Sequence, residues 1–420
     1  MTTFMRRLFS FLVVLIGCVG GCASKPERAT VIWISIDGLR PDYLDRANAP
    51  LLNRLVREGA STRELIPPTP SLTFTSHLTQ ATGVGPAHHG IPGNSFYDTA
   101  TKQRYNFPHE AAMLQAEPIW LTAKRQGVRT LVHDWPLAHA QAGPVRTDYF
   151  LDKFEAATTD QHRLARLLEV WRNDAGREPL RLLMSYVKQP DVVGHRHGPD
   201  GRETLAAVEQ TDALLQRFVD AAVAQFEKER RRGDELYVVL TSDHGMSMAA
   251  TSVNLDKLLE RPLPRSVTRI NSAAFVMLYF DQVPDTEREA LKANVLRDLR
   301  RQPAALTVYT RDSLPPRWNL AHPTRVGDIV ILAKPGHAFS TRLPLAIYPS
   351  EKVGEQGGVH GYAPEESPDM NAFCVIWRYP NRLKRRELGK VRAEQMHPTV
   401  ARLLNVKPAP NVRATGVSVR

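Results

Sequence analysis

Six side chains of this sequence belong to residue types that bind metal ions in catalytic sites. Three are carboxylates and three are imidazoles: Asp37, Asp191, His195, Asp243, His244 and His360. The set is too large for one four-coordinate zinc ion but sufficient for two. Two divalent ions about 3.5–4 Å apart stabilise both the attacking and the leaving oxygen of an in-line phosphoryl displacement. The set therefore predicts a two-metal hydrolase of phosphate esters, and its ligands would accept manganese as well as zinc.

A threonine near these ligands is a candidate nucleophile. Thr73 lies in the segment PSLTFTSH. A threonine hydroxyl is a poor nucleophile at neutral pH, but coordination to a metal ion lowers its pKa and makes it reactive. Each feature is weak alone, because Asp-x-x-x-His arises by chance and Asp-His after a strand also suits a cap or a turn. The prediction depends on the complete set.

The candidate carboxylates follow apolar runs that are typical of buried strands. These runs cover residues 30–36, 180–187 and 235–242, and Asp37, Asp191 and Asp243 each come shortly after one of them. In an open α/β sheet, ligands bind outside the carboxyl ends of the strands. Three aspartates from separate segments are therefore expected at one place.

Helical patterns alternate with these strands. Helices are expected over residues 49–59, 117–127, 162–173, 202–232 and 394–404, and further strands over 128–133 and in the segments AAFVMLYF, GDIVILA and AFCVIW. Such alternation predicts an α/β fold, a mostly parallel central sheet with helices on both faces. Because no linker or repeat interrupts the pattern, residues 29–420 are expected to form a single catalytic domain.

Composition narrows the class of protein. The chain has 420 residues, of which 42% are hydrophobic and 24% charged, as in ordinary globular proteins. Its net charge of +11 is dispersed, and the basic runs at 228–232 and 384–386 lack interleaved aromatic residues. No nucleic-acid partner is therefore expected, although a basic surface attracts anionic substrates or membranes. The sequence does not indicate an oligomeric state.

The first 28 residues have the pattern of a targeting segment and tether. Two arginines precede the apolar run LFSFLVVLIG, which is shorter than a stable transmembrane helix requires. Cys18 and Cys22 follow small residues and resemble the lipidation site of bacterial lipoproteins. We expect an exported protein of the periplasm or outer membrane, in contact with the membrane only through a lipid anchor; an ordinary cleaved signal peptide is the alternative. Cys374, in AFCVIW, is expected to pack in the core.

Ten segments together resemble a known family. They are ISIDGLRPDYL, TPSLTFTSHLTQATG, HHGIPGNSFYD, EPIWLTAKRQG, DWP, PDVVGHRHGP, TSDHGM, RVGDIVILAKPG, GGVHGY and PDMNAFCV. In order and spacing they are similar to bacterial nucleotide pyrophosphatases/phosphodiesterases of the alkaline phosphatase superfamily. The resemblance covers most of the chain after the targeting segment and implies an alkaline-phosphatase-like fold.

The resemblance also implies roles for the candidate residues. One zinc ion would be bound by Asp191, His195 and His360, and the other by Asp37, Asp243, His244 and the Thr73 oxygen. Thr73 would attack phosphorus and form a phospho-threonine, which water activated on the first zinc ion would hydrolyse. The implied activity is hydrolysis of phosphodiester or phosphoanhydride bonds, with nucleotides as substrates and nucleoside monophosphates as products.

Three further residues are candidates for contacts with the substrate. Asn94 matches a family asparagine that donates a hydrogen bond to a phosphoryl oxygen, although Gly-Asn is also strong turn chemistry. Phe74 and Tyr149 are candidates for stacking a nucleobase, with packing in the core as the alternative for both. After the nucleophile the family commonly has Phe-Pro-Asn-His, whereas this chain has Phe-Thr-Ser-His. The difference concerns the shape of the loop and the fit of the substrate.

The remaining histidines and the alternative activities complete the prediction. His77, His88, His89 and His197 are interpreted as structural or rim residues, and the role of His133, in a segment that forms the pocket wall in the family, stays open. A phosphomonoesterase and a lipid head-group phosphodiesterase are the alternative activities. A catalytically silent surface lipoprotein is the alternative from another class, disfavoured because all six ligands and Thr73 are present.

Overall fold

The computed structural model describes residues 28–151, 153–354 and 357–419. The predicted targeting segment, with Cys18 and Cys22, lies outside these ranges. Within them, no helix combines the length and the apolar character needed to cross a bilayer. Cys374 is buried and free, as the sequence predicts.

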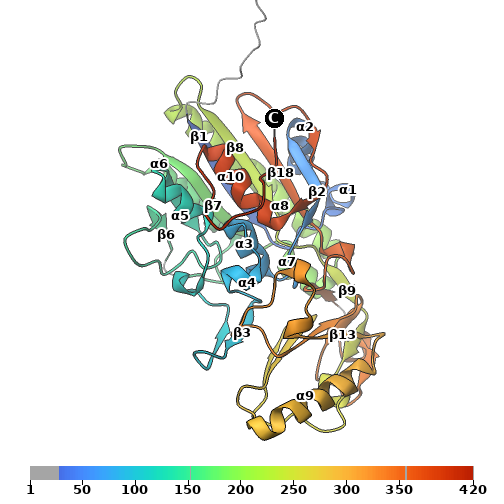
Figure 1. Ribbon diagram of the computed structural model, residues 1–420. Helices are drawn as coiled ribbons and strands as arrows, with labels where there is room; N and C mark the ends of the chain where they lie inside the picture. Colours follow the sequence, from blue (N-terminus) through green and yellow to red (C-terminus); the bar gives the residue numbers. More distant parts are fainter. Residues whose placement is uncertain (1–27, 152, 355–356, 420) are drawn as a thin grey trace, which may run out of the picture.

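A mixed sheet forms the centre of the molecule (Figure 1). Within the described residues it has nine strands, and β8, β1, β7 and β5 form its parallel centre. The order is β19 (Arg386–Glu387), β2 (Ala60–Ile66), β18 (Ala372–Tyr379), β8 (Glu235–Thr241), β1 (Ala29–Ile36), β7 (Leu180–Val187), β5 (Arg129–His133) and β6 (Tyr149–Phe150), with β20 (Val391–Arg392) beside β2. Strand β18 runs antiparallel to both of its neighbours.

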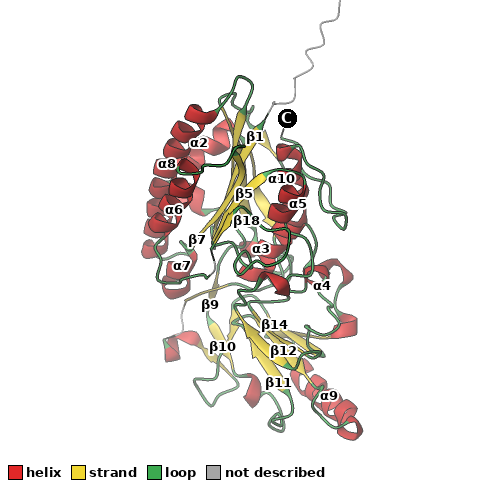
Figure 2. Ribbon diagram, turned by 90° about the vertical axis from the view of Figure 1, so that its left-hand side faces the viewer, coloured by secondary structure: helices red, strands yellow, loops and turns green. Residues whose placement is uncertain are grey.

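Helices cover both faces of this sheet (Figure 2). One face carries α2 (Pro50–Glu58), α6 (Asp160–Arg172) and α8 (Arg202–Glu229), and the other carries α3 (Thr73–Thr82), α5 (Ile119–Arg125) and α10 (Met396–Leu404). Strand β1 is buried on both sides, because Trp33 packs into one apolar cluster and Ile34 into the other. The predicted α/β class is therefore confirmed.

A second, smaller lobe lies beyond the carboxyl ends of the parallel strands. Its antiparallel sheet has the order β11 (Thr268–Asn271), β12 (Phe275–Tyr279), β14 (Ile329–Ala333) and β13 (Leu306–Thr310), beside α9 (Asp285–Arg300). A three-stranded sheet of β15 (His337–Phe339), β10 (Thr251–Val253) and β16 (Ile347–Pro349) adjoins it. Strands β12 and β14 were expected in the central sheet; an apolar run shows that a strand is buried but does not identify its partners.

Short elements connect the lobes and border the carboxyl ends of the strands. They are α1 (Tyr43–Arg46), α4 (Pro86–His89), the hairpin β3 (Ser95–Asp98) and β4 (Gln103–Asn106), α7 (Asp191–His197), and the pair β9 (Ser247–Ala249) and β17 (Gly357–Val359). One apolar cluster contains side chains of both lobes, among them Trp33 and Met277. A shared core is what a single domain requires, and the domain limits at 29 and 420 stay a prediction.

Candidate active site

The register of two parallel strands brings two of the aspartates together. Ser35 of β1 lies beside Thr241 of β8, and Asp37 and Asp243 each follow two residues later. Both carboxylates therefore leave the sheet at the same level. Asp243 accepts hydrogen bonds at Oδ1 from the amides of Gly38 (3.1 Å) and His244 (3.0 Å), which fix its orientation.

Asp191 joins them from the neighbouring strand β7. Its amide donates to the Asp37 carbonyl oxygen over 3.2 Å, which joins the start of α7 to the end of β1. Gly38 has a φ of +66°, and a Cβ there would lie 2.9 Å from the Asp191 Cβ. Glycine is thus required by both conformation and space. The three carboxylates are buried.

Backbone carbonyls orient the three candidate histidines in the same way. The Nδ1 atoms of His195, His244 and His360 lie 2.8, 2.9 and 2.9 Å from the carbonyl oxygens of Gly358, Gly245 and Ser71. Donation from Nδ1 places the lone pair of each neutral ring on Nε2, the form that binds metal ions. The close approach of β17 to α7 makes the His195 contact possible, because a Cβ on Gly357 would lie 2.1 Å from the His195 carbonyl oxygen.

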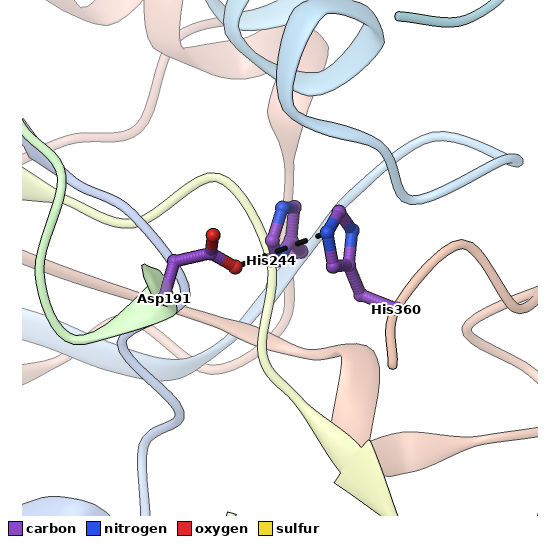
Figure 3. Close-up of side chains that lie close together, drawn as sticks. All are labelled: Asp191, His244 and His360. Carbon is purple, nitrogen blue, oxygen red and sulfur yellow. Dashed lines mark ion pairs between the residues drawn. The ribbon is translucent and has the colours of Figure 1, made fainter. Parts of the chain in front are cut away.

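Two groups of potential ligands result, and they adjoin. Asp37, Asp243 and His244 form one, and Asp191, His244 and His360 form the other, each with ligand atoms within 4.8 Å of one another. Figure 3 shows Asp191 and His360 facing each other with His244 beside them. His195 also reaches this place, since its Nε2 lies 3.4 Å from Asp191 Oδ1. The side chain of His195 is 40% exposed, which makes it the most accessible of the six.

The donor atoms fit divalent cations. Asp37 Oδ1, Asp191 Oδ1 and Asp243 Oδ2 are buried and have no hydrogen-bond partner among the described residues. Asp37 accepts a hydrogen bond from the Tyr186 hydroxyl at its other oxygen. Three buried carboxylates without cations repel one another, and such groups normally bind a metal ion or remain protonated.

Burial raises the pKa values of the candidate carboxylates and lowers that of His360, because it disfavours the charged form of each group. Burial and the nearby carboxylates Asp191 and Asp243 raise the pKa of Asp37 well above its usual range. Burial also raises the pKa of Asp243 to about 6. Burial, with His195 nearby, lowers the pKa of His360 to about 3, so the imidazole is neutral and able to bind a metal ion.

The candidate nucleophile lies at a helix N-terminus beside these ligands. Thr73 is the first residue of α3, and its Oγ1 lies 3.3 Å from His244 Nε2. A helix N-terminus presents amide groups and a partial positive charge, which favour a bound phosphate. Thr73 is therefore close to both the potential ligands and a place suited to an anion.

Asn94 lines the same cavity as Thr73 and is held in place through its side-chain amide oxygen. Oδ1 accepts a hydrogen bond of 2.9 Å from the amide of Phe74. The side-chain NH₂ group thereby remains available to a ligand in the cavity that Asn94 lines. The arrangement suits the donor role that the resemblance implied.

A cavity of about 230 Å³ opens beside the site. It is lined by Asp37, Thr73, Phe74, Asn94, Phe107, His109, Asp134, Pro136, His139, Phe154, Tyr186, Asp191, His195 and His360. The sequence reasoning missed Phe107, His109, His139, Phe154 and Tyr186. Phe107 follows the β3–β4 hairpin and packs edge-on against Phe74, with ring centroids 5.4 Å apart. Only the three-dimensional path of that hairpin brings the two rings together.

Tyr149, expected beside a nucleobase, lies elsewhere. It belongs to the edge strand β6, packs against the apolar cluster beneath α6 and α8, and donates a hydrogen bond of 2.8 Å to Asp174. It does not line the cavity. The sequence GPVRTDYF does not predict this position of Tyr149. It results from the pairing of β6 with β5 at the edge of the sheet.

The histidines interpreted from the sequence as structural or rim residues do not line the cavity. His77 is buried with Nδ1 2.7 Å from the Thr73 carbonyl oxygen, and His89 contacts Thr79 and the amide of Ile91. His88 and His197 are exposed. His133 is buried next to Asp134 and does not line the cavity, whereas Asp134 and Pro136 of the same segment do.

Comparison with solved structures identifies the same fold. Murine ectonucleotide pyrophosphatase/phosphodiesterase 5, an inactive variant in complex with AMP, superposes with a TM-score of 0.77 at 21% identity. The match covers 93% of this chain and 97% of that chain. Human ectonucleotide pyrophosphatase/phosphodiesterase 5 also has a TM-score of 0.77, at 22% identity.

Relatives in sequence span almost the whole chain. An uncharacterized pyrophosphatase/phosphodiesterase of Schizosaccharomyces pombe is 29% identical over 96% of this chain and 83% of its own length. A bis(5'-adenosyl)-triphosphatase of Mus musculus is 26% identical over 93% of this chain and 81% of its own length. These relatives are fungal and animal, so the bacterial origin suggested by the sequence stays a prediction.

The sequence profile of the type I phosphodiesterase/nucleotide pyrophosphatase family matches residues 31–363. This range contains all six potential metal ligands, Thr73 and Asn94. The names of the family and of the Mus musculus relative describe cleavage of phosphodiester or pyrophosphate bonds. The chain is an enzyme that belongs to the type I phosphodiesterase/nucleotide pyrophosphatase family.

Proposed function

We propose that this enzyme cleaves nucleotides at a phosphodiester or phosphoanhydride bond and releases a nucleoside monophosphate, with Thr73 as nucleophile and two zinc ions as cofactors. One observation carries the proposal. The Thr73 hydroxyl lies beside His244, at the N-terminus of α3 and close to three buried carboxylate oxygens that have no hydrogen-bond partner among the described residues. The remaining observations concern the substrate.

The residues around the phosphate would have distinct roles. Asp37, Asp243 and His244 would bind one ion, and Asp191, His195 and His360 the other; the bound ions would supply positive charge at the phosphate and acidify the hydroxyl. Thr73 Oγ1 attacks phosphorus, the bond to the leaving oxygen breaks, and a phospho-threonine forms. Water then cleaves it and regenerates Thr73. The Asn94 NH₂ group donates to a non-bridging oxygen as negative charge develops there.

The cavity favours a diester with an aromatic group. Phe74 and Phe107 form an aromatic wall near Thr73, suited to stacking a nucleobase. Among the described residues that line the cavity there is no lysine or arginine to balance the extra charge of a monoester. The activity named for the Mus musculus relative, on bis(5'-adenosyl) triphosphate, agrees with such a substrate class.

We also propose that the protein is exported and held at a membrane through lipid on Cys18 or Cys22. The support lies in the sequence, where two arginines and an apolar run precede both cysteines. Mass spectrometry of the mature protein tests this proposal. A diacylglycerol-modified cysteine at the new N-terminus is expected, and an unmodified N-terminus beyond residue 22 contradicts it.

A comparison of rates tests the proposed activity. The enzyme is given the nitrophenyl ester of thymidine monophosphate and, separately, nitrophenyl phosphate, with and without a chelator. We expect preference for the diester, loss of activity with the chelator and recovery with zinc. Thr73→Ala should lower kcat by at least about 10³-fold, as removal of a catalytic nucleophile does elsewhere. Preference for the monoester would contradict the proposal and indicate a phosphomonoesterase.

A further inference from the structure

The sheet edge opposite to the candidate active site gathers basic side chains from three connections: the end of α6 with the loop after it, the end of α8 with the loop after it, and the loop after β18. Strand register places the loops together, because Ala29 of β1 lies beside Glu235 of β8, Leu236 lies beside Tyr379 of β18, and Val31 lies beside Leu182 of β7. Adjacent strands are about 4.8 Å apart, so loops at the ends of these four strands are neighbours. We call the following seven side chains the basic edge: Arg172, Arg177, Lys228, Arg231, Arg232, Lys384 and Arg385.

The positive charge of the basic edge is largely uncompensated. All seven side chains are exposed, and none has an ion-pair partner within the described part of the chain. Of the nearby carboxylates, Glu178 is exposed and has no ion-pair partner among the described residues, so it offsets one of the seven positive charges, whereas two others are paired. Asp234 pairs with Arg28 at 2.6 Å, and Glu58 pairs with Arg382 at 2.8 Å. The two basic runs of the sequence, about 150 residues apart, thus lie at one sheet edge and give it a net positive charge.

A hollow of about 380 Å³ opens at this edge. Four arginines line it, Arg28, Arg172, Arg177 and Arg231. Of its two acidic residues, Asp174 pairs with Arg129, and Glu229 accepts a hydrogen bond of 3.2 Å from the Trp171 indole, so the arginines outnumber the acidic residues. The hollow is large enough for a phosphate head group.

We propose that the basic edge binds the surface of an anionic phospholipid bilayer. The inference rests on the proposed membrane anchor only because that anchor would hold the basic edge close to the bilayer. Five residues lie between Cys22 and Arg28, and the six Cα-to-Cα steps span at most about 20 Å when extended. An anchored chain therefore holds this edge near the head groups, where each basic side chain strengthens binding about five-fold.

The orientation that follows suits the proposed activity. Strand β1 begins at the basic edge and ends one residue before Asp37. Its eight residues cover roughly 26 Å. With the basic edge on the bilayer, the metal ligands and the cavity face away from it, and soluble nucleotides reach the site freely.

The shape of the basic edge favours a membrane over a nucleic acid. Its charges come from three separate connections, and each of the two helices contributes only one residue, Arg172 of α6 and Lys228 of α8, whereas groove binding uses several side chains of one helix or of a two-stranded ribbon. The loops at 172–179, 227–233 and 380–387 contain no aromatic residue on which single-stranded bases could stack. A flat anionic surface requires neither feature.

Vesicle partitioning tests the proposal with the full chain carrying Cys18→Ser and Cys22→Ser, which prevents acylation. Binding is measured to phosphatidylcholine vesicles and to vesicles with 30% phosphatidylglycerol. The measured quantity is the ratio of the partition coefficient on the anionic vesicles to that on the neutral vesicles, in which the contribution of the apolar N-terminal segment cancels. At 0.1 M salt we expect a ratio on the order of 100 or more, which approaches one at 1 M salt because the charges are screened.

Two matched variants locate the effect. Replacing Arg172, Arg231, Lys384 and Arg385 by glutamine should bring the ratio to within a few-fold of one. The control replaces three arginines and one lysine that are exposed on the second lobe, Lys257, Arg261, Arg265 and Arg300, and should leave the ratio unchanged. Equal losses in both variants, or a wild-type ratio near one, would overturn the proposal.

Two parallel measurements separate the remaining outcomes. Binding of a 20-base-pair DNA duplex that depends on the same four residues, without vesicle binding, would show a nucleic-acid site and overturn the proposal. Hydrolysis of the nitrophenyl diester should be equal in all variants. Absence of hydrolysis with intact vesicle binding would overturn only the proposed function, whereas hydrolysis with a vesicle ratio near one would overturn only the membrane inference.

Discussion

The imidazole rings of His244 and His360 are stacked, with centroids 3.6 Å apart and planes inclined by 15°. Each ring has its Nδ1 atom at a backbone carbonyl oxygen and presents Nε2 to the carboxylates. Their contact joins the two ligand groups, because His244 is within reach of both. Two cations bound by these adjoining groups would be able to act on a single phosphate.

Removal of metal ions should destabilise the enzyme as well as inactivate it. Without cations, Asp37, Asp191 and Asp243 are buried carboxylates with unsatisfied oxygens. A chelator should lower Tm by several degrees, and zinc should restore it, since ions that bind only the folded state stabilise it. In Asp243→Asn, the amide oxygen still accepts the two backbone hydrogen bonds, so this variant should be less sensitive to the chelator in calorimetry. Equal sensitivity would contradict the assignment of Asp243 as a ligand.

Asn94 offers a substitution that separates its two roles. Asn94→Asp keeps an oxygen for the Phe74 amide but replaces the donor NH₂ group by a carboxylate. We expect kcat to fall by roughly 10²- to 10³-fold, the usual effect of losing one transition-state donor. Tm should stay within about 2 °C of wild type, whereas Asn94→Ala should also lower Tm. A normal kcat in Asn94→Asp would show that Asn94 is only a turn residue.

Phe107 should contribute to nucleotide binding. It is 44% exposed, an unusual position for a large aromatic side chain, and it contacts Phe74 at the cavity wall. Stacking on an aromatic ring contributes roughly five- to hundred-fold in affinity. Phe107→Ala should raise KM for the thymidine ester in this range with little change in kcat. Leu345→Ala, at another exposed apolar residue, is the control, and equal KM values in both variants would exclude stacking on Phe107.

His397 should make the fold sensitive to acid. It is fully buried, with Nδ1 2.7 Å from the Ala81 carbonyl oxygen and Nε2 accepting from the Ala409 amide at 3.1 Å. Burial lowers its pKa to about 4. Between pH 6.5 and 4 the unfolded chain therefore binds a proton that the folded protein excludes. The free energy of unfolding should fall with decreasing pH in this window, by up to about 1.4 kcal/mol per unit from this group.

Urea unfolding at pH 7, 6 and 5 checks the dependence on His397. His397→Gln should be less stable at pH 7 because a buried hydrogen bond is lost, but its stability should vary less with pH. His88→Gln, at an exposed histidine, should behave as wild type. The same slope in His397→Gln and wild type would show that other groups cause the acid sensitivity.

The parts of the fold that follow from local pattern could be predicted. Strand β1 is an uninterrupted apolar run, and the residues after it and after β8 had to lie at one sheet edge, so Asp37 and Asp243 were predictable as neighbours. The pairing of β12 with β14 was not, because an apolar run carries no information about its partner. For the same reason, the sequence predicts Tyr149 at the cavity, where it does not lie, and misses Phe107, which does line the cavity. The path of the backbone, set by distant contacts, decides which aromatic ring reaches the cavity.

The ligands extend from Asp37 to His360, so the site depends on almost the entire length of the polypeptide. The carboxylates of one ligand group meet only after β8 has paired with β1, and β8 gains its second neighbour, β18, only when residues 372–379 are present. Non-local pairing of this kind forms late in folding. A nascent or truncated chain that lacks these segments therefore lacks the assembled ligand set, so binding of metal ions would have to follow folding of the whole domain.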